Sequence, residues 1–463
     1  MKKILEKKGR RRLLIYFLTA LRQNRHTMPF LFLLVIFLLT PTLPVFANSF
    51  LTLDKAVKMA QEHSFIIQIS DVNQQTAKHD LNTIRANRYP TLSLNASGFY
   101  VNKLQKIDAL PAAMEIGSHE NYQADVRLSF PIYTGGKLDG SILAVKAISE
   151  GELFEYDAQK LAVSFQSRLA WFNLSMRQRL VNSAEVSLER INIIKENIIN
   201  LHNNGLADSV DILETELAYE NGREQLLQME NELHNASTKL AILIGVCSKE
   251  VIELPPEIPR PDNSILQYQD FLIDTDSIFR PELKKISSKI NSAEQQIRIK
   301  RAAYIPNITG FGGYSIGKPN RNMFDPEWND YFSAGLMLNW EFNFGGKAGS
   351  DIASAKQKLS SVRLNYLAVE EKLHLESEIA LENILSAYKL YESSQRKYNI
   401  TGNKFRLAKE KQKAGGLTVN RLLEIESEYS AAEQIYFVSQ LKYYINESYF
   451  LYAIGSDKIY GGF

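Results

Sequence analysis

Residues 120–146 read ENYQADVRLSFPIYTGGKLDGSILAVK and residues 330–356 read DYFSAGLMLNWEFNFGGKAGSDIASAK, and these two stretches decide the fold. In each, apolar and polar residues alternate up to a Gly-Gly-Lys turn, after which a long segment contains no proline. Alternation with a period of two indicates a β-strand with one apolar and one polar face. A long segment without proline is a candidate for a long helix. The same passage from strand to helix therefore occurs twice.

The repetition extends beyond these stretches at an offset of 210 residues. The matches include Gly205 with Gly415, Leu213-Glu214 with Leu423-Glu424, and Ile244-Gly245 with Ile454-Gly455. Repetition at a fixed offset predicts two structural copies. Between them, Pro255-Pro256-Glu257-Ile258-Pro259-Arg260-Pro261 is typical of a stiff, extended linker. The predicted organisation is a signal peptide (1–47), a first repeat (48–254), a Pro-rich linker (255–262) and a second repeat (263–463), each repeat comprising a helix, a β-hairpin and a long helical hairpin.

One face of the first proline-free segment is apolar with helical spacing. Its residues follow one another at intervals of three or four: Phe165, Leu169, Phe172, Met176, Leu180, Ala184, Leu188, Ile191, Ile194, Ile198 and Leu201. This spacing predicts an amphipathic helix whose apolar face packs against neighbouring helices. A helix from about Lys137 to Asn203 would be on the order of 100 Å long at ~1.5 Å per residue, far longer than a compact domain needs.

The N-terminal residues differ in charge from the rest of the chain. Residues 1–47 hold nine bases and one acid, so the remaining residues carry 45 bases and 51 acids, a net charge of −6. This acidic remainder argues against a nucleic-acid binder, because phosphate contacts need an excess of Lys and Arg. The basic segment precedes an apolar run at 28–39 and then Val45-Phe46-Ala47, which is the layout of a secretory signal peptide. We therefore expect the chain from Asn48 onward to be exported.

Four segments are predicted strands. The alternation is clear at 124–130 and 332–344 and less regular at 92–96 and 308–316. The pattern alone also allows soluble hairpins with one face on a protein core. The rest of the chain, however, is predicted to be long polar helix and offers no layer to cover the apolar faces, so we expect them to contact lipid. Lipid does not tolerate an open sheet edge and four strands cannot close a barrel, so strands from several chains must combine. Three chains would supply twelve.

This order of elements, with Tyr133-Thr134-Gly135-Gly136-Lys137 and Phe344-Gly345-Gly346-Lys347 leading from strand to helix, resembles the TolC-type outer-membrane efflux proteins from Leu51 to Gly455. The resemblance implies a mainly α fold with a membrane β-barrel: a homotrimer whose twelve-strand barrel, four strands per chain, continues into a long α-helical barrel. It implies a place in the outer membrane of a Gram-negative cell, with the helices extending into the periplasm. It also implies a channel that catalyses no reaction and serves as the exit duct for a periplasmic adaptor (membrane fusion protein) and an inner-membrane pump.

Two alternatives stay open. An exit duct of a type I protein secretion system would share this fold entirely. A periplasmic coiled-coil adaptor would explain the helices, but it would need small β domains and no strands that face lipid. The class of the pump and the transported substrate are not set by the sequence.

The predicted tips of the helical hairpins carry glycine. The long helices stop at Asn203-Asn204-Gly205-Leu206 and at Ala414-Gly415-Gly416-Leu417, and a helix resumes after each. Glycine at these positions indicates a helix turn with a glycine C-cap. We expect the tips, with Gly205, Leu206, Gly415, Gly416 and Leu417, to contact the adaptor.

The resemblance implies that acids at the start of the returning helices help close the tunnel and bind cations at its mouth. Counted from the capping glycine, Asp211 and Glu424 match such acids, whereas Arg421 stands where the family often has an acid. Gln412 and Leu417 replace the tyrosine and the arginine that complete the closing network elsewhere in the family. We hypothesise that Glu424 and Arg421 of neighbouring chains ring the closed aperture, and that Asp211 holds the inner hairpin to the outer.

Asp208 is a further gate candidate, three residues before Asp211. The alternative for both is a favourable interaction with the helix dipole in the first turn, worth ~0.3–1 kcal/mol each. For Glu426 and Glu428, farther along the second returning helix, the preferred interpretation is an ordinary solvated face.

Catalytic and metal sites find little support in the sequence. Gly135-Gly136-Lys137 resembles part of a phosphate loop but lacks its first glycine, and its return at Gly345-Gly346-Lys347 favours a tight strand-to-helix turn. The seven histidines include no pair at metal-ligand spacing, and Cys247 has no other cysteine to pair with. We expect no enzyme activity, no cofactor and no bound metal.

Overall fold

The computed structural model describes residues 50–107, 114–247, 252–262, 279–321 and 327–461. The predicted signal peptide, residues 1–47, lies outside the described residues. The contacts divide the chain into two units, Met1–Phe50 and Leu51–Phe463. Every helix and strand considered below belongs to the second unit.

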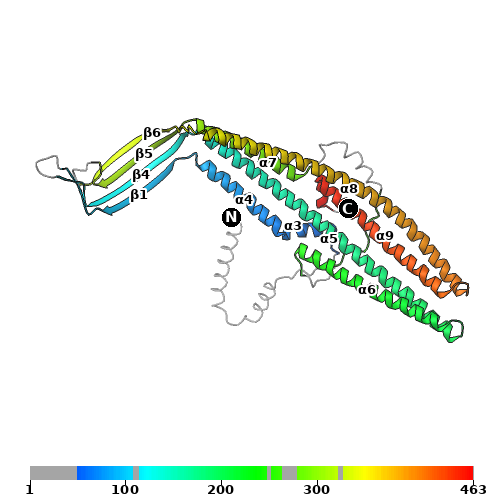
Figure 1. Cartoon of the computed structure of the whole chain (residues 1–463). Helices are drawn as coiled ribbons and strands as arrows, with labels where there is room; N and C mark the ends of the chain where they lie inside the picture. Colours follow the sequence, from blue (N-terminus) through cyan, green and yellow to red (C-terminus); the bar gives the residue numbers. More distant parts are fainter. Residues whose placement is uncertain (1–49, 108–113, 248–251, 263–278, 322–326, 462–463) are drawn as a thin grey trace, which may run out of the picture. The chain divides into compact units, whose positions relative to one another are not determined.

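A four-stranded antiparallel sheet unites the predicted hairpins of both repeats. Its strands are β1 (Thr91–Tyr100), β4 (Glu120–Tyr133), β5 (Asn307–Lys318) and β6 (Asn329–Asn339), in the order β1-β4-β5-β6 (Figure 1). A separate two-stranded ribbon pairs β2 (Gln105–Ile107) with β3 (Met114–Ile116). All four predicted strands are confirmed, and β1 and β6 form the two edges of the sheet.

The strand register places most apolar residues of the four strands on one face, whereas Phe311 and Met337 lie on the other. Leu94 pairs with Val126, Val126 with Tyr314, and Tyr314 with Phe332, so one apolar row crosses the whole sheet. In a single chain this face is uncovered, with Leu94 74% and Phe332 71% exposed. The neighbouring row, on the opposite face, contains polar residues such as Asp125, which pairs with Ser315.

The strand predicted to reach residue 344 ends earlier, at Asn339. Asn339 pairs with Asn307, which is the first residue of β5, so no partner strand remains for the residues that follow. Alternation in the sequence thus continues past the point where the hydrogen-bonded ladder stops. The aromatic residues Trp340, Phe342 and Phe344 lie in the connection to the next helix.

The helical part, as far as the structure describes it, consists of three shorter helices and two long hairpins. The helices are α3 (Leu53–His63), α4 (Phe65–Ala86), α5 (Lys137–Asn203), α6 (Ser209–Ile244), α7 (Pro281–Arg301), α8 (Lys347–Lys413) and α9 (Val419–Ile454), with 3-10 turns at Ala302–Tyr304 and Asp457–Tyr460. The predicted helix from Lys137 to Asn203 is confirmed, and α5 and α8 each have 67 residues. None of the helices built from the described residues combines the length and hydropathy needed to cross a membrane.

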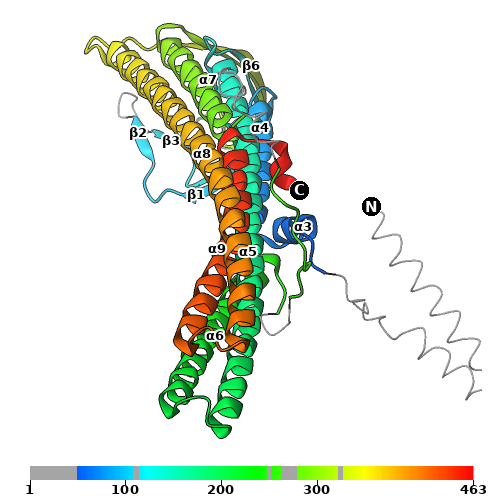
Figure 2. The ribbon, with the colours of Figure 1, turned by 90° about the vertical axis from the view of Figure 1, so that its right-hand side faces the viewer.

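Helices α6, α5, α9 and α8 follow one another in that order, because α5 packs on both α6 and α9, and α8 packs on α9 (Figure 1). Figure 2 shows the two long hairpins with their tips at the lower end. The main core forms where all four meet, around Trp171 and Phe172 of α5, Leu240 of α6, Ile384 of α8 and Leu441 of α9. Most of the predicted apolar face of α5 is buried there or nearer the tips: Phe172, Leu180, Ala184, Ile191, Ile194 and Ile198.

The linker runs between the hairpins without helix or strand, as far as residues 252–262 describe it. Its backbone carbonyls accept hydrogen bonds from helical side chains. Arg179 Nη2 of α5 donates to Pro256 O at 3.0 Å, and Gln440 Nε2 and Tyr444 OH of α9 both donate to Pro259 O at 3.0 Å. The Pro-rich segment is therefore a strap across α5 and α9, consistent with the predicted extended linker.

Candidate functional site at the hairpin tips

Both hairpin tips end their first helix in the same way. At the first tip, Leu206 N donates to Leu201 O at 2.9 Å and Gly205 N to His202 O at 2.8 Å. At the second tip, Gly416 N donates to Lys411 O and Gly415 N to Gln412 O, both at 2.9 Å. This is the Schellman motif, whose left-handed position favours glycine. Gly205 (φ +74°) and Gly415 (φ +75°) occupy it, so both predicted glycine caps are confirmed.

The returning helices begin with side-chain caps. Asp208 Oδ1 accepts from Ser209 N at 2.6 Å, and Asp211 Oδ2 accepts from Asp208 N at 3.2 Å, which completes a capping box on α6. At α9, Thr418 Oγ1 accepts from Arg421 N at 3.4 Å. These bonds satisfy backbone amides that have no partner inside the helix. Among the described residues, the hydrogen bonds of Asp208 and Asp211 stay within the first hairpin, as the helix-terminus interpretation of these acids predicts.

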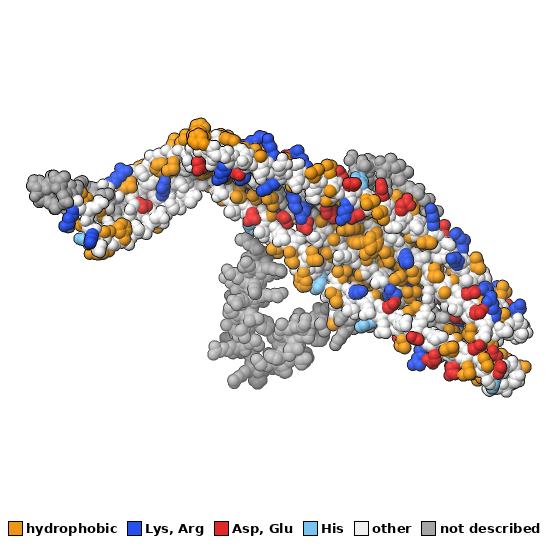
Figure 3. All heavy atoms as spheres, viewed as in Figure 1, with side chains coloured by type: hydrophobic (Ala, Val, Ile, Leu, Met, Phe, Trp, Pro, Cys, Tyr) orange, Lys and Arg blue, Asp and Glu red, His pale blue; other side chains and the backbone are white. Residues whose placement is uncertain are grey.

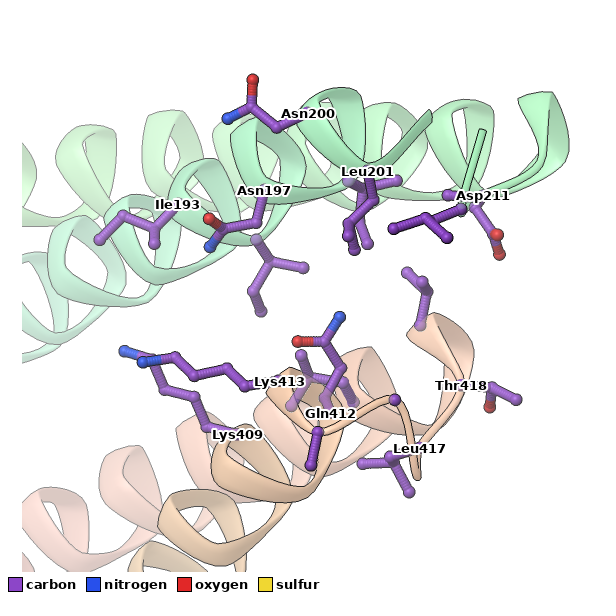
Figure 4. A pocket seen from close by; sticks show the side chains of 18 of the residues that line it. Ile193, Asn197, Asn200, Leu201, Asp211, Lys409, Gln412, Lys413, Leu417 and Thr418 are labelled. Atoms are coloured by element: carbon purple, nitrogen blue, oxygen red, sulfur yellow. The ribbon is translucent and has the colours of Figure 1, made fainter. Parts of the chain in front are cut away.

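A groove of about 790 Å³ separates the two tips (Figure 4). In Figure 4, Asn197 and Leu201 extend from α5 toward Gln412 of α8, whereas Asn200 points away from the groove. An apolar cluster forms its floor, with Ile198 and Leu422 almost fully buried. The wall includes several predicted tip residues, namely Leu206, Asp211, Gly415 and Leu417.

The groove itself is basic. Among its charged lining residues, Arg190 pairs with Glu426 of α9, and Lys409 and Lys413 then stand against Asp211. Asp208, Arg421 and Glu424 are not among the lining residues. The acids that the sequence suggested for a cation-binding mouth are therefore divided between the groove and the outer surface of the tips in a single chain.

The predicted aperture residues Arg421 and Glu424 lie on one exposed face of α9. Arg421 Nη1 donates to Glu424 Oε2 at 2.5 Å, an i,i+3 pair in which both side chains are more than half exposed. On the same helix, a hydrogen bond from Lys404 of α8 lowers the pKa of Glu428. The ring that Arg421 and Glu424 would form between neighbouring chains stays a prediction, since it needs more than one chain.

A buried polar cluster joins the two hairpins farther from the tips. Arg190 of α5 donates from Nε to Glu426 Oε1 at 3.0 Å, and its Nη2 lies 3.5 Å from Glu433 Oε2. Ser187 Oγ donates to Glu426 and Ser183 Oγ to Glu433, at 3.0 and 2.9 Å. The interpretation of Glu426 as a solvated residue is wrong, because its side chain is only 3% exposed and its charge is balanced by Arg190.

The sequence does contain a signal for this cluster. Ser183, Ser187 and Arg190 follow one another by four and three residues, and Glu426 and Glu433 of α9 are seven apart with Ser430 between them. Such spacing places each set on one helix face. What the sequence does not contain is the pairing of the two faces, which depends on how α5 packs against α9.

Aromatic side chains continue the contact between α8 and α9. Tyr398 stacks on Tyr429 and Tyr436, with ring centroids 5.7 and 5.2 Å apart, and Phe405 stacks on Tyr429 at 5.6 Å. The guanidinium of Arg190 lies 4.9 Å from the centroid of Tyr429, a cation–π contact. Burial and the hydrogen bond with Tyr429 raise the pKa of Tyr398, so this phenol stays protonated.

At the opposite ends of the long helices, the two Gly-Gly turns differ. Gly135 (φ +60°) and Gly136 (φ +83°) are both left-handed, whereas in the second turn only Gly346 (φ +72°) is, and Gly345 is not. A Cβ on Gly135 would lie 2.9 Å from the Cβ of Ile305. The first turn lies between β4 and α5, and the second precedes α8. Within the described residues, no cluster of three or more His, Cys, Asp or Glu has a geometry that could hold a metal ion.

The model of the outer membrane efflux protein family matches residues 56–246 and 277–455, which include both hairpins, all four strands of the sheet and both tips. The chain belongs to this family. The resemblance found in the sequence is thereby confirmed, and so is the outer membrane as the location.

Individual relatives are distant. The pyoverdine export outer membrane protein OpmQ of Pseudomonas aeruginosa is 24% identical over 330 residues, which span 70% of this chain and 64% of that protein. The probable outer membrane lipoprotein SilC of Salmonella typhimurium is 23% identical over 84% of this chain and 82% of its own length. The solved outer-membrane channel OprN superposes with a TM-score of 0.75 at 15% identity, covering 88% of this chain and 90% of that one. The family and this structural neighbour are channel proteins, not enzymes.

Proposed function

We propose that three copies of this chain form a channel that conducts substrates passively through the outer membrane and the periplasm. The observation that carries the proposal is the sheet: among the described residues of one chain, its apolar face is uncovered and its edge strands β1 and β6 each have one unpaired side. A sheet in lipid must have no free edge. Pairing β6 of one chain with β1 of the next, three times, gives a closed barrel of twelve strands.

The helices support the same closure. In the order α6-α5-α9-α8, helices α6 and α8 are the free edges, and both keep large apolar residues exposed, such as Leu213 on α6 and Leu367 and Ile400 on α8. A cyclic trimer would place α6 of one chain beside α8 of the next. Each strand of the sheet adjoins one helix, β1 with α4, β4 with α5, β5 with α7 and β6 with α8, so the twelve strands would continue into twelve helices.

The hairpin tips are proposed as the closable mouth and as the contact for a periplasmic adaptor and an inner-membrane pump, which supplies the energy. Within this proposal, Glu424 and Arg421 of neighbouring chains ring the aperture, and Asp211 couples the two hairpins beside the basic groove. One relative named for pyoverdine export makes small-molecule efflux the first candidate process. An exit duct for secreted proteins would have the same architecture.

Single-channel recording in a planar lipid bilayer tests this function. The purified protein should insert and show a low-conductance closed state. Asp211→Ala and Glu424→Ala should each raise the closed-state conductance, because each removes a charge proposed to hold the mouth shut. Glu230→Ala, an exposed acid far along α6, is the matched control and should leave conductance unchanged.

Failure to insert would count against the channel itself. Insertion with the same closed-state conductance in all variants would reject only the assignment of the gate. A deletion strain scored for sensitivity to dyes, bile salts and metals, together with its secreted-protein profile, separates efflux from protein export.

A further inference from the structure

The passage from sheet to helices concentrates exposed aromatic and basic side chains. We name residues 85–89, 131–140, 298–305 and 340–351 the junction. These segments touch one another: Arg88 Nη2 donates to Asp139 Oδ1 at 2.5 Å, and Lys300 Nζ to Asp351 Oδ2 at 3.5 Å. The junction holds seven bases and three acids: Arg85, Arg88, Lys137, Arg298, Lys300, Arg301 and Lys347 against Asp139, Glu341 and Asp351.

Large aromatic residues surround these cations. Phe344 is 100% exposed, and Tyr89, Tyr304, Trp340 and Phe342 are also exposed. Figure 3 shows hydrophobic side chains where β6 passes into α8, with basic side chains on the adjacent start of the helices. Tyr and Trp favour the boundary between hydrocarbon and water, and Lys and Arg near that boundary attract anionic head groups.

Arg298 is placed to bind an anion. It lines a groove of about 520 Å³ together with Arg88, Tyr133, Thr134 and the Gly135–Gly136 turn. A Cβ on Gly136 would lie 3.4 Å from Arg298 Nε, so the guanidinium lies directly over the glycine. Arg88 already pairs with Asp139, whereas the Arg298 side chain has no hydrogen-bond or ion-pair partner among the described residues.

We propose that the junction binds the phosphate of phospholipid head groups, with Arg298 as the principal contact and the exposed aromatic residues against the acyl chains. This proposal rests on the proposed function, because it requires the apolar face of the sheet to lie in the bilayer. The groove would then lie at the level of the head-group phosphates, because it opens where the apolar strands end and the polar helices begin. Arg suits this role, since its guanidinium can donate two parallel hydrogen bonds to a phosphate.

Native mass spectrometry of the full-length, delipidated protein in detergent tests the proposal. The probes are phosphatidylglycerol and a diacylglycerol with the same chains, which lacks the phosphate. The Arg298→Gln variant should bind phosphatidylglycerol about tenfold more weakly, as expected for the loss of one charge-assisted contact. The affinity of Arg298→Lys for phosphatidylglycerol should lie between those of Arg298→Gln and the wild type. Lysine keeps the positive charge but cannot donate two parallel hydrogen bonds to the phosphate. Diacylglycerol should bind the wild type and both Arg298 variants with similar affinity.

Arg406→Gln, a change of another arginine, exposed on α8 outside the junction, is the matched control and should bind as the wild type does. Unchanged phosphatidylglycerol binding in Arg298→Gln would overturn the proposal. Displacement of the lipid by glycerol 3-phosphate at similar concentrations would show a site for soluble phosphate and would also overturn it. The same preparations are recorded in a planar bilayer, so that loss of channel activity, which refutes the proposed function, is distinguished from loss of lipid binding alone.

Discussion

Arg190 shows how a single residue couples the two hairpins. Its guanidinium lies between the carboxylates of Glu426 and Glu433, and serine hydroxyls donate to both acids. A buried ion pair adds little net stability over an apolar pair, but removing one partner leaves a costly unpaired charge. The cluster therefore specifies which face of α5 meets α9.

Replacement of Arg190 by leucine should lower the free energy of unfolding by ~3–5 kcal/mol, because Glu426 and Glu433 would stay buried without a cation. The midpoint of thermal unfolding of the purified protein, followed by circular dichroism, measures this. Arg223→Leu, which removes an exposed i,i+3 pair on α6, should change little. A triple variant with leucine at positions 190, 426 and 433 should recover most of the lost free energy of unfolding. Equal midpoints for Arg190→Leu and Arg223→Leu would contradict the role of the cluster.

At the scale of elements, the two strand-to-helix turns resemble each other in sequence but not in conformation. In the first, both glycines are left-handed and the first packs on Ile305. In the second, Gly345 has a backbone that other residues can adopt, and an added Cβ would meet only the flexible side chain of Asn343, at 3.3 Å. The two copies therefore differ in tolerance to substitution.

Gly135→Ala should be destabilising by about 1–2 kcal/mol from the left-handed backbone alone, with the contact to Ile305 adding to it. Gly345→Ala, the equivalent change in the second turn, should be close to neutral. Thermal unfolding of both variants provides the comparison, and each serves as the control for the other. Equal destabilisation would mean that the turns are alike in the assembled protein.

At the scale of the whole molecule, one chain is incomplete. Within the part of the chain that the structure describes, the sheet has two free edges, and helices α6 and α8 expose apolar residues along the outer sides of the helical layer. Exposed apolar surface of this extent marks an interface with lipid or protein. The trimer proposed above covers the helical surface with neighbouring copies and leaves the surface of the sheet to lipid.

Leu213→Glu on α6 and Ile400→Glu on α8 should each prevent stable trimers, because each would bury an unpaired carboxylate between chains. The molar mass in detergent from light scattering, together with the heat-modifiable band on gels, reports assembly. Arg406→Glu, an exposed change near Ile400 on α8, should leave the trimer intact. Trimers of normal stability in both Leu213→Glu and Ile400→Glu would reject this pairing of α6 with α8.

Much of the architecture follows from the sequence because its causes are local. Absence of proline and apolar spacing set the helix from Lys137 to Asn203, and glycine at 205 and 415 ends the long helices through backbone conformation alone. Alternation located the strands but overran the end of β6, because the end of a strand depends on a partner and not on its own side chains.

The candidate site was only partly predictable, for the same reason. The tip glycines and the acids Asp208 and Asp211 could be placed from the sequence, since caps involve residues a few positions apart. The role of Glu426 could not, because its partner Arg190 lies 236 residues away and meets it only when α5 packs on α9. The basic groove likewise arises from side chains of separate helices.

The sequence by itself determined most of the elements and their order, because proline, glycine and hydrophobic periodicity act within one element. Only the tertiary structure decided which faces meet: the single sheet from two distant hairpins, the strap across α5 and α9, the buried Arg190 cluster and the position of Arg298 over the Gly136 turn. These depend on contacts between residues far apart in the chain, which packing of the core sets and no local pattern contains.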